Sequence, residues 1–358
     1  MTVFKGKATF VGPKTLDTGT GETITAERIV IAAGGHPQML DVPGLDQPDP
    51  DHGIHTNDSI MRLTDLPERI IIVGGGYIAA EFANVFGGLG SAVTWIQRSE
   101  RLLRSQDETI STRYTELAAA KYDLRLGARP IKAEQVGDEV QLTCASAEGE
   151  FMVSAPVVLV AIGRVPYAND LDVKAAGVAQ HDDGRIKVDS YQQTSVEGIF
   201  ALGDISSDFQ LKHVANREAK TVKYNLAHPE SMMSTDHRVV PFAVFSHPQI
   251  ASFGATEQQL KAAGAKYLVK VQDYGDVAYG WAMEDKTGIV KLLADPSTRQ
   301  LLGAHIMGHE ASMLIQPLIQ GAQFNQTVDQ IATEQYWIHP ALTEVIENAL
   351  LGLEPNGD

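Results

Sequence analysis

The sequence predicts an α/β fold that ends in a C-terminal α+β domain. First, a short apolar strand, a run of three glycines and an apolar helix follow one another from residue 69. Second, further short apolar runs typical of buried strands recur before residue 203. Third, the composition changes near residue 236. The strand-like runs and two closing helices that follow indicate an antiparallel sheet.

The bulk composition limits the class of protein. A chain of 358 residues suggests two or three domains at roughly 100–200 residues each. A net charge of −16 argues against nucleic acid or an anionic membrane as a partner, so an anionic ligand requires a local basic patch. The single cysteine, Cys144, excludes an intrachain disulfide and a Cys-rich metal site. Without a signal-like apolar core or an apolar run of about 18 residues, we predict a soluble, cytoplasmic protein.

The apolar pattern places the expected elements along the chain. Strands are expected at 3–11, as a hairpin over 15–25 and at 28–33, before an irregular connector over 36–53. Residues 57–59 are expected to cap a short helix, and helices are expected at 107–121 and 216–226. Two or three strands reach residue 153, and others are expected at 157–162, 186–189 and 199–202. The last third is expected to contain helices at 256–263, 310–323 and 340–350, with strands at 242–245, 267–272, 278–284, 288–294 and 300–307.

The glycine run lies inside one βαβ unit. A strand at 70–73 leads through a G-x-G-x-x-A turn at Gly74, Gly76 and Ala79 into a helix, and a second strand follows at 92–97. Gly74 allows a sharp turn, Gly76 leaves room for a pyrophosphate, and Ala79 lets the helix pack on the sheet. The pattern predicts a dinucleotide with its phosphates at the helix N-terminus, and the alternative is a glycine turn that only packs. The expected inner side of the helix consists of Ile78, Phe82, Val85 and Phe86.

Two arginines follow the second strand of this unit. Gln97 stands where NAD-preferring units carry an acidic residue for the ribose 2′-hydroxyl. Arg98 and Arg104, six residues apart, suit a 2′-phosphate because the guanidinium fork matches phosphate geometry. The loop therefore favours NADPH over NADH, and the alternative is a solvated basic loop.

Two further places carry possible chemistry. Asp204 follows an apolar strand and can either accept hydrogen bonds from a cofactor hydroxyl or cap the helix after it. His339 precedes Pro340, a residue suited to the first position of a helix, and Glu344 lies just over one turn inside. Such a carboxylate orients an imidazole for proton transfer, although a histidine before proline is more often structural.

Together these segments resemble the class I pyridine nucleotide–disulfide oxidoreductases, the flavoenzymes that include glutathione reductase and dihydrolipoamide dehydrogenase. The resemblance rests on residues 71–83, 161–166 and 198–204 and on His339-Pro340 with Glu344, in the family's order and spacing. Within the class, residues 272–285 and 336–342 look most like the mycothione reductases, which reduce mycothiol disulfide with NADPH.

The resemblance implies a domain for each segment and a role for each site residue. It implies a partial FAD-binding domain at 1–66, a Rossmann-like NADPH-binding domain at 67–165, the second part of the FAD-binding domain at 166–236 and a dimerisation domain at 237–358. Tyr77 would gate the nicotinamide pocket beside the flavin, and Asp204 would bond the ribityl chain. His339, paired with Glu344, would be the acid–base and would reach the partner subunit's active site in a homodimer. The other implied NADPH-binding residues are Gly74, Gly76, Ile78, Ala79, Glu81, Arg98, Arg104 and Gly163. The implied FAD-binding residues are Gly34, Leu211, Lys212, His213 and Val214, besides Asp204.

The sequence also departs from the family pattern. The family's own FAD-binding G-x-G-x-x-G and its Cys-x4-Cys redox pair are not in this sequence, and Cys144 lies in no redox motif. We therefore expect the chain to begin inside the FAD-binding domain and to be unable to complete the family's reaction as given. The alternatives are a dihydrolipoamide dehydrogenase, a soluble transhydrogenase-like flavoenzyme, or a non-catalytic fragment that binds NADPH and dimerises.

Overall fold

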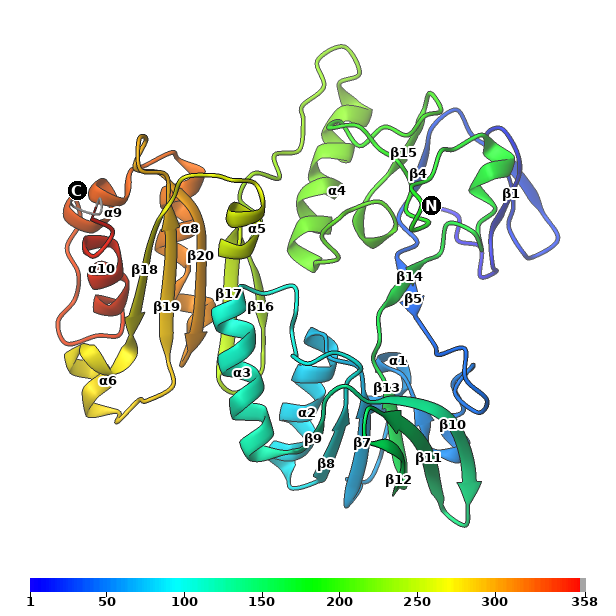
Figure 1. The fold of residues 1–358 in the computed structure, drawn as a ribbon. Helices are drawn as coiled ribbons and strands as arrows, with labels where there is room; N and C mark the ends of the chain where they lie inside the picture. Colours follow the sequence, from blue (N-terminus) through cyan, green and yellow to red (C-terminus); the bar gives the residue numbers. More distant parts are fainter. Residues whose placement is uncertain (355–358) are drawn as a thin grey trace. The chain divides into compact units, whose positions relative to one another are not determined.

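A computed structural model describes residues 1–354, which divide into two compact units. The first unit combines Met1–Gln38 with Arg164–Val240, and the second combines Met39–Gly163 with the chain from Pro241 onward (Figure 1). The predicted α/β class with an α+β C-terminal part is confirmed.

The second unit contains a five-stranded parallel sheet. Its strand order is β6 (Ile54–His55), β13 (Val157–Val160), β7 (Arg69–Val73), β8 (Ala92–Ile96) and β9 (Asp123–Arg125). Every residue of β13, and all of β7 after Arg69, is buried, as expected for parallel strands with both faces covered. The predicted order of strand, glycine turn, helix and strand is confirmed by β7, α2 (Tyr77–Leu89) and β8.

One expectation about α2 is wrong. The face against the sheet is lined by Ala79, Ala80 and Ala83 with Phe86, whereas Val85 is 42% exposed. Small side chains let the helix axis approach the strands closely, so the alanine stripe makes the contact together with Phe86, the predicted inner residue that is buried. Ile78 and Phe82 are partly buried at the edge of that contact.

Other elements of this half follow the sequence more closely. The predicted helix at 107–121 is confirmed as α3 (Glu108–Lys121), with Asp107 as its N-cap. The short helix α1 (Asn57–Ile60) has Thr56 as its N-cap, and residues 57–59 lie inside the helix; Ser59 still contributes to the cap, because its side chain accepts the Thr56 N–H and completes a capping box. An antiparallel meander completes this half; it consists of β10 (Arg129–Val136), β11 (Glu139–Ser146) and β12 (Gly149–Ala155).

The C-terminal half of the second unit is an antiparallel sheet, as predicted. Its strand order is β16 (Phe242–Val244), β17 (Gln249–Gly254), β20 (Leu301–Gly308), β19 (Ile289–Ala294) and β18 (Leu268–Asp273). The expected helix near 256–263 is α5 (Glu257–Ala262), and β17 was not predicted.

Three further expectations for this half are wrong. The expected strand at 278–284 is the helix α6 (Ala278–Ala282), because the chain has already left the sheet through a tight turn at 274–276. The helix expected at 310–323 is split into α7 (Ala311–Leu314) and α8 (Gln316–Gln323), and Pro317, which lacks an N–H, lies in the first turn of α8. Pro340 is not at a helix start, because α10 spans Glu344–Leu351; α9 (Val328–Thr333) was not predicted.

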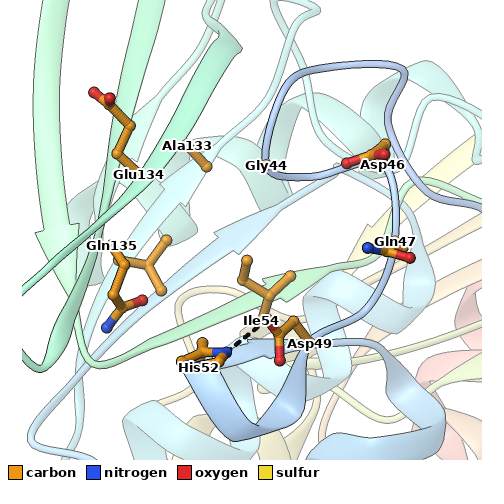
Figure 2. A pocket seen from close by; sticks show the side chains of 10 residues that line it. Gly44, Asp46, Gln47, Asp49, His52, Ile54, Ala133, Glu134 and Gln135 are labelled. Carbon is orange, nitrogen blue, oxygen red and sulfur yellow. Dashed lines mark hydrogen bonds and ion pairs between the residues drawn. The ribbon is translucent and has the colours of Figure 1, made fainter.

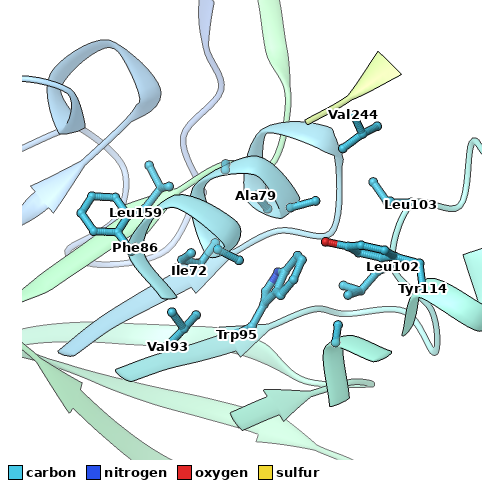
Figure 3. Close-up of a cluster of buried hydrophobic side chains, with 14 of the residues drawn as sticks. Ile72, Ala79, Phe86, Val93, Trp95, Leu102, Leu103, Tyr114, Leu159 and Val244 are labelled. Atoms are coloured by element: carbon cyan, nitrogen blue, oxygen red, sulfur yellow. The ribbon is translucent and has the colours of Figure 1, made fainter. Parts of the chain in front are cut away.

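One hydrophobic core joins the two halves of the second unit. Trp95 lies fully buried at its centre, and its indole N–H donates to the Gly74 carbonyl at 2.5 Å (Figure 3). The same cluster includes Val244, Ile250, Ile289 and Met307 of the antiparallel sheet. Helices α2 and α3 contact strands of both sheets. The parallel sheet and the antiparallel sheet are therefore packed as one body.

The first unit is built from small sheets and one long helix. The predicted hairpin is confirmed by β2 (Thr15–Asp17) and β3 (Thr23–Thr25), and β2 also pairs with β1 (Thr9–Gly12). The strand expected at 3–11 is shorter than predicted, because residues 3–8 lie outside β1. The strand expected at 186–189 is only an isolated bridge at Ile186. The remaining elements are β4 (Ile29–Ile31) parallel to β15 (Ile199–Ala201), β5 (Gly35–Pro37) antiparallel to β14 (Arg164–Pro166), and α4 (Lys212–Ala227), which begins four residues before its predicted start.

Candidate functional site

The two turn glycines meet different surroundings. Gly74 has φ +130°, and a Cβ built on it would lie 2.2 Å from the Ala161 carbonyl oxygen. Gly76 has φ −88°, and a Cβ there would meet no atom within 4 Å. Gly76 is also the N-cap of α2, and no side chain caps that helix. The turn therefore presents an open helix N-terminus, which favours an anion by its N–H groups and its dipole.

The first two turns of α2 contain two of the predicted residues, Tyr77 and Glu81. Tyr77 is 42% exposed at the first position of the helix. Glu81, one turn later, accepts a hydrogen bond from the Phe245 N–H at 3.0 Å. Burial raises the pKa of the Glu81 carboxyl, and this hydrogen bond opposes the rise only in part. Ala79 is fully buried and Ile78 partly buried, so these two pack and do not line the open end.

The structure brings the arginine loop to the same glycine turn. The Leu103 N–H donates to the Gly75 carbonyl at 2.7 Å, which ties the loop to the turn. Arg98 and Arg104 are exposed, and neither forms an ion pair with any residue that the structure describes. Arg101, between them, pairs with Glu108 at 2.7 Å. Two of the three arginines thus remain available for an anion beside the turn.

Gln97 and Gly163 complete the surroundings of the turn. The Gln97 side chain accepts from the Arg98 N–H at 3.0 Å and donates to Ser99 Oγ at 2.6 Å. The Gln97 side chain therefore stabilises the conformation of the arginine loop, because both of its partners are loop residues. Gly163 is exposed with φ +148° and follows β13, which pairs with β7; this pairing brings the two strand ends together.

In the first unit, Asp204 lies on a short helical turn (Gly203–Ile205) directly after β15 and is half-buried. The structure also shows a carboxylate that the sequence reasoning missed. Glu218 of α4 is 1% exposed, accepts the Gly203 N–H at 2.6 Å, and lies 3.2 Å from His237 Nε2. The signal that could have found it is a glutamate on the apolar face of a helical pattern.

The other predicted residues of the first unit lie at turns. Leu211 is the N-cap of α4, with no side chain bonded to the helix end, and Lys212, His213 and the buried Val214 form its first turn. Gly34 has φ +67°, and a Cβ there would meet open space. This unit therefore offers an uncapped helix N-terminus and a partly exposed carboxylate, Asp204.

His339 and Glu344 form the pair that the spacing suggested. Nδ1 of His339 lies 2.7 Å from a Glu344 carboxylate oxygen, and the other oxygen accepts the Ala341 N–H at 3.0 Å. These bonds, that of His339 first, lower the pKa of the Glu344 carboxyl. The His339 side chain is 69% exposed, so its other ring nitrogen is accessible to a partner. Its neighbours Tyr336 and Ile338 are also strongly exposed.

Other features of the second unit lie apart from these residues. A pocket between the connector and the meander contains the pair of His52 and Asp49, whose nitrogen and oxygen lie 2.7 Å apart, and none of the predicted residues lines it (Figure 2). Cys144 is fully buried, and burial raises the pKa of its thiol to about 11. Within residues 1–354, no three His, Cys, Asp or Glu side chains are grouped to hold a metal. Across the same residues, no helix has both the length and the apolar character to cross a membrane.

Comparison with known proteins agrees with this geometry. Residues 1–219 match the model of the pyridine nucleotide-disulphide oxidoreductase family, and residues 240–350 match the dimerisation domain of the same family. Mycothione reductase of Mycobacterium tuberculosis is 51% identical over 345 residues, which cover 94% of this chain and 73% of that protein. Glutathione reductase of Burkholderia cepacia is 35% identical, covering 96% of this chain and 74% of that protein.

Solved structures show the same fold. The flavoprotein disulfide reductase RclA of Escherichia coli has a TM-score of 0.85 at 25% identity, over 98% of this chain and 79% of that one. LpdA of Mycobacterium tuberculosis has a TM-score of 0.84 at 25% identity, over 98% and 76%. Enzymes of the matched family use FAD and NAD(P)H. The chain therefore belongs to the pyridine nucleotide-disulphide oxidoreductase family.

Proposed function

We propose that this chain acts in the NADPH- and FAD-dependent reduction of mycothiol disulfide. The observation that carries the nucleotide part is the open helix N-terminus at Gly76, with two exposed arginines on the loop tied to it that form no ion pair with residues 1–354. The substrate part rests on the similarity to mycothione reductase along nearly the whole chain.

The residues of the second unit fit an NADPH. The uncapped N-terminus of α2 would hold the pyrophosphate, because the space above Gly76 is open. Arg98 and Arg104 would bind the 2′-phosphate by charge-assisted hydrogen bonds. Tyr77 and Glu81 would lie near the nicotinamide, and Gly163 would border the same cleft. Residues 67–165 are therefore the proposed NADPH-binding domain.

The first unit fits part of an FAD. Asp204 would accept hydrogen bonds from the ribityl hydroxyls, and the backbone from Leu211 to Val214 would face the flavin ring from an uncapped helix end. At Gly34, which has no side chain, the FAD would be able to approach the protein backbone closely. Bound there, FAD would supply an acceptor for the electrons of the nicotinamide; the next acceptor in this family, a cysteine pair, is not among the 358 residues. The sequence predicted the FAD-binding segments at 1–66 and 166–236, and the first unit suggests different bounds, 1–38 and 164–240.

His339 and Glu344 would manage the proton. Glu344 holds Nδ1 of His339, which leaves the exposed Nε2 to give a proton to a departing thiolate or to take one from a thiol. The match to the dimerisation domain supports a homodimer through residues 237–358, in which this exposed pair would serve the partner's site.

A second candidate follows from the cysteine count. The 358 residues contain one cysteine, and it is buried, so a redox pair cannot form within them. A protein that binds NADPH and dimerises without reducing a disulfide fits that observation. Absorbance of the purified protein and NADPH consumption with mycothiol disulfide distinguish the two. A yellow protein that turns over supports the reductase, whereas a colourless protein that binds NADPH supports the second candidate.

The nucleotide assignment has a direct test. The double variant Arg98→Ala with Arg104→Ala should weaken 2′,5′-ADP binding by about 100-fold or more in calorimetry, since two charge-assisted bonds at roughly 1.5–3 kcal/mol each sum to about 3–6 kcal/mol. Binding of 5′-ADP should change little. The matched control is Arg101→Ala, which removes an arginine already paired with Glu108. An equal loss for both ligands would refute the 2′-phosphate assignment.

A further inference from the structure

A buried charged cluster joins the arginine loop to the antiparallel sheet. Lys291 of β19 has a side chain only 2% exposed, and its ammonium donates to Asp107 at 2.8 Å, Thr109 at 2.9 Å and Glu257 at 2.6 Å. These three bonds use every hydrogen of the ammonium. Asp107 is fully buried and is the last residue before α3, at the end of the loop that carries Arg98 and Arg104.

Asp107 is bonded on both carboxylate oxygens. One oxygen accepts from Lys291 and from the Thr109 N–H at 3.0 Å, and the other accepts the Glu257 N–H at 2.9 Å. The carboxylate therefore caps α3, accepts the first N–H of α5, whose N-cap is Thr256, and pairs with the ammonium of a third element. Although burial opposes it, the hydrogen bonds from Lys291 and from the Glu257 N–H lower the pKa of Asp107, which favours the charged carboxylate.

The preceding residue, Gln106, is held by hydrogen bonds from two residues of the antiparallel-sheet half. Its side-chain oxygen accepts from Ser252 Oγ at 2.9 Å, and its carbonyl accepts from the Gln258 side chain at 2.9 Å. Gln106 is 3% exposed. The loop end at 106–107 is therefore fixed by β17, α5 and β19 of the antiparallel sheet domain.

Arg104 lies between two such anchors. On one side the Leu103 N–H is bonded to the Gly75 carbonyl of the glycine turn; on the other side are Gln106 and Asp107. The Arg104 side chain itself is exposed. A backbone fixed on both sides reduces the freedom that an arginine loses when it binds a phosphate.

We propose that Lys291 and Asp107 are positioning residues for recognition of the 2′-phosphate, so that the dimerisation domain sets the nucleotide selectivity of the neighbouring domain. This inference rests on the NADPH site proposed above. A buried ion pair contributes little net stability compared with apolar residues of the same shape, but it requires one geometry. Because the pair holds Asp107 in one place, it holds the end of the loop, and with it the position of Arg104 relative to the glycine turn.

The test measures selectivity separately from stability. Calorimetry gives the ratio of the dissociation constants of 5′-ADP and 2′,5′-ADP, and a thermal melt gives the midpoint of each variant. Lys291→Met should reduce the ratio by about tenfold, because small displacements of a binding group cost large factors. If Lys291→Met does not fold, Ser252→Ala with Gln258→Ala removes the milder anchors of Gln106 and should reduce the ratio in the same direction.

The chain offers a matched control. Arg113 of α3 also bridges to the antiparallel-sheet half, but its guanidinium pairs with Asp273 at 3.2 Å and donates to the Lys286 carbonyl at 3.1 Å, both outside the arginine loop. Arg113→Ala should leave the ratio unchanged. A folded Lys291→Met, or Ser252→Ala with Gln258→Ala, that keeps the wild-type ratio, or that weakens both ligands equally, overturns the inference. If the wild-type protein itself does not prefer 2′,5′-ADP, the proposed NADPH site fails instead.

Discussion

Gly74 and Gly76 are two residues apart, yet alanine at each should have different consequences. At Gly74, the backbone has φ +130°, a region that residues with a Cβ rarely adopt, and the new methyl would lie 2.2 Å from the Ala161 oxygen. The unusual conformation costs roughly 1–3 kcal/mol. Overpacking against a backbone atom, which cannot swing away, adds roughly 1–3 kcal/mol.

The expected total for Gly74→Ala is a loss of about 2–6 kcal/mol in the free energy of unfolding. The nearby hydrogen bond from the Trp95 indole to the Gly74 carbonyl, at 2.5 Å, would be strained by the same shift. At Gly76, with φ −88° and open space, Gly76→Ala fits without a clash. Its stability should change by less than about 1 kcal/mol, since a stiffer unfolded chain offsets a poorer N-cap.

For NADPH affinity, in contrast to stability, the substitution at Gly76 should be the one with the clear effect. The Gly76→Ala methyl would occupy the space proposed for the pyrophosphate, so NADPH affinity should fall by at least about tenfold while the fold is kept. Urea unfolding followed by tryptophan fluorescence, with Trp95 as the buried reporter, measures stability, and calorimetry measures binding. A Gly74→Ala variant as stable as Gly76→Ala, or a Gly76→Ala variant that binds NADPH like the wild type, would contradict these roles of the two glycines.

Three further outcomes are expected. Although burial opposes it, hydrogen bonds from Lys261 and neighbouring groups lower the pKa of Glu257 to about 2. Its contribution to stability should be complete above pH 4.5 and be lost as the pH falls towards 2, so urea midpoints between pH 5 and 3 should drop more steeply in the wild type than in Glu257→Gln. Cys144, buried and with a raised pKa, should resist a thiol reagent at pH about 8 in the folded protein and react once unfolded, and rapid labelling of the folded form would contradict its burial. Glu344→Gln should change stability by less than about 1 kcal/mol because His339 is exposed, yet slow any turnover of mycothiol disulfide by at least about tenfold; unchanged turnover would remove the pair from the mechanism.

The local elements around the glycine turn could be predicted from the sequence. A run of β-branched residues from Ile70, three glycines and a helical pattern are short-range signals, and β7 and α2 form where they indicate. The helix face was predicted less well. Periodicity identifies an apolar face, but close packing on the sheet selected the alanines and left Val85 exposed.

The last third of the chain shows a second reason why local sequence patterns do not predict every element. The segment 278–284 has apolar residues at strand-like spacing, but a turn after β18 takes it out of the sheet, and it forms α6. Where a strand ends depends on its hydrogen-bonding partners, here β19, and not on its own composition. The same dependence explains why β17, between β16 and β20, was missed.

By itself the sequence determined the glycine turn, the two arginines after it and the pairing of His339 with Glu344. Each of these features depends only on residues that lie a few positions apart in the sequence. Only the tertiary structure decided that Lys291 reaches Asp107, which lies 184 residues earlier. That contact depends on the strand order of one sheet and on the packing of α3 beside it, and local periodicity records neither. The selectivity of the arginine loop is therefore proposed to depend on residues outside the motif that first revealed it.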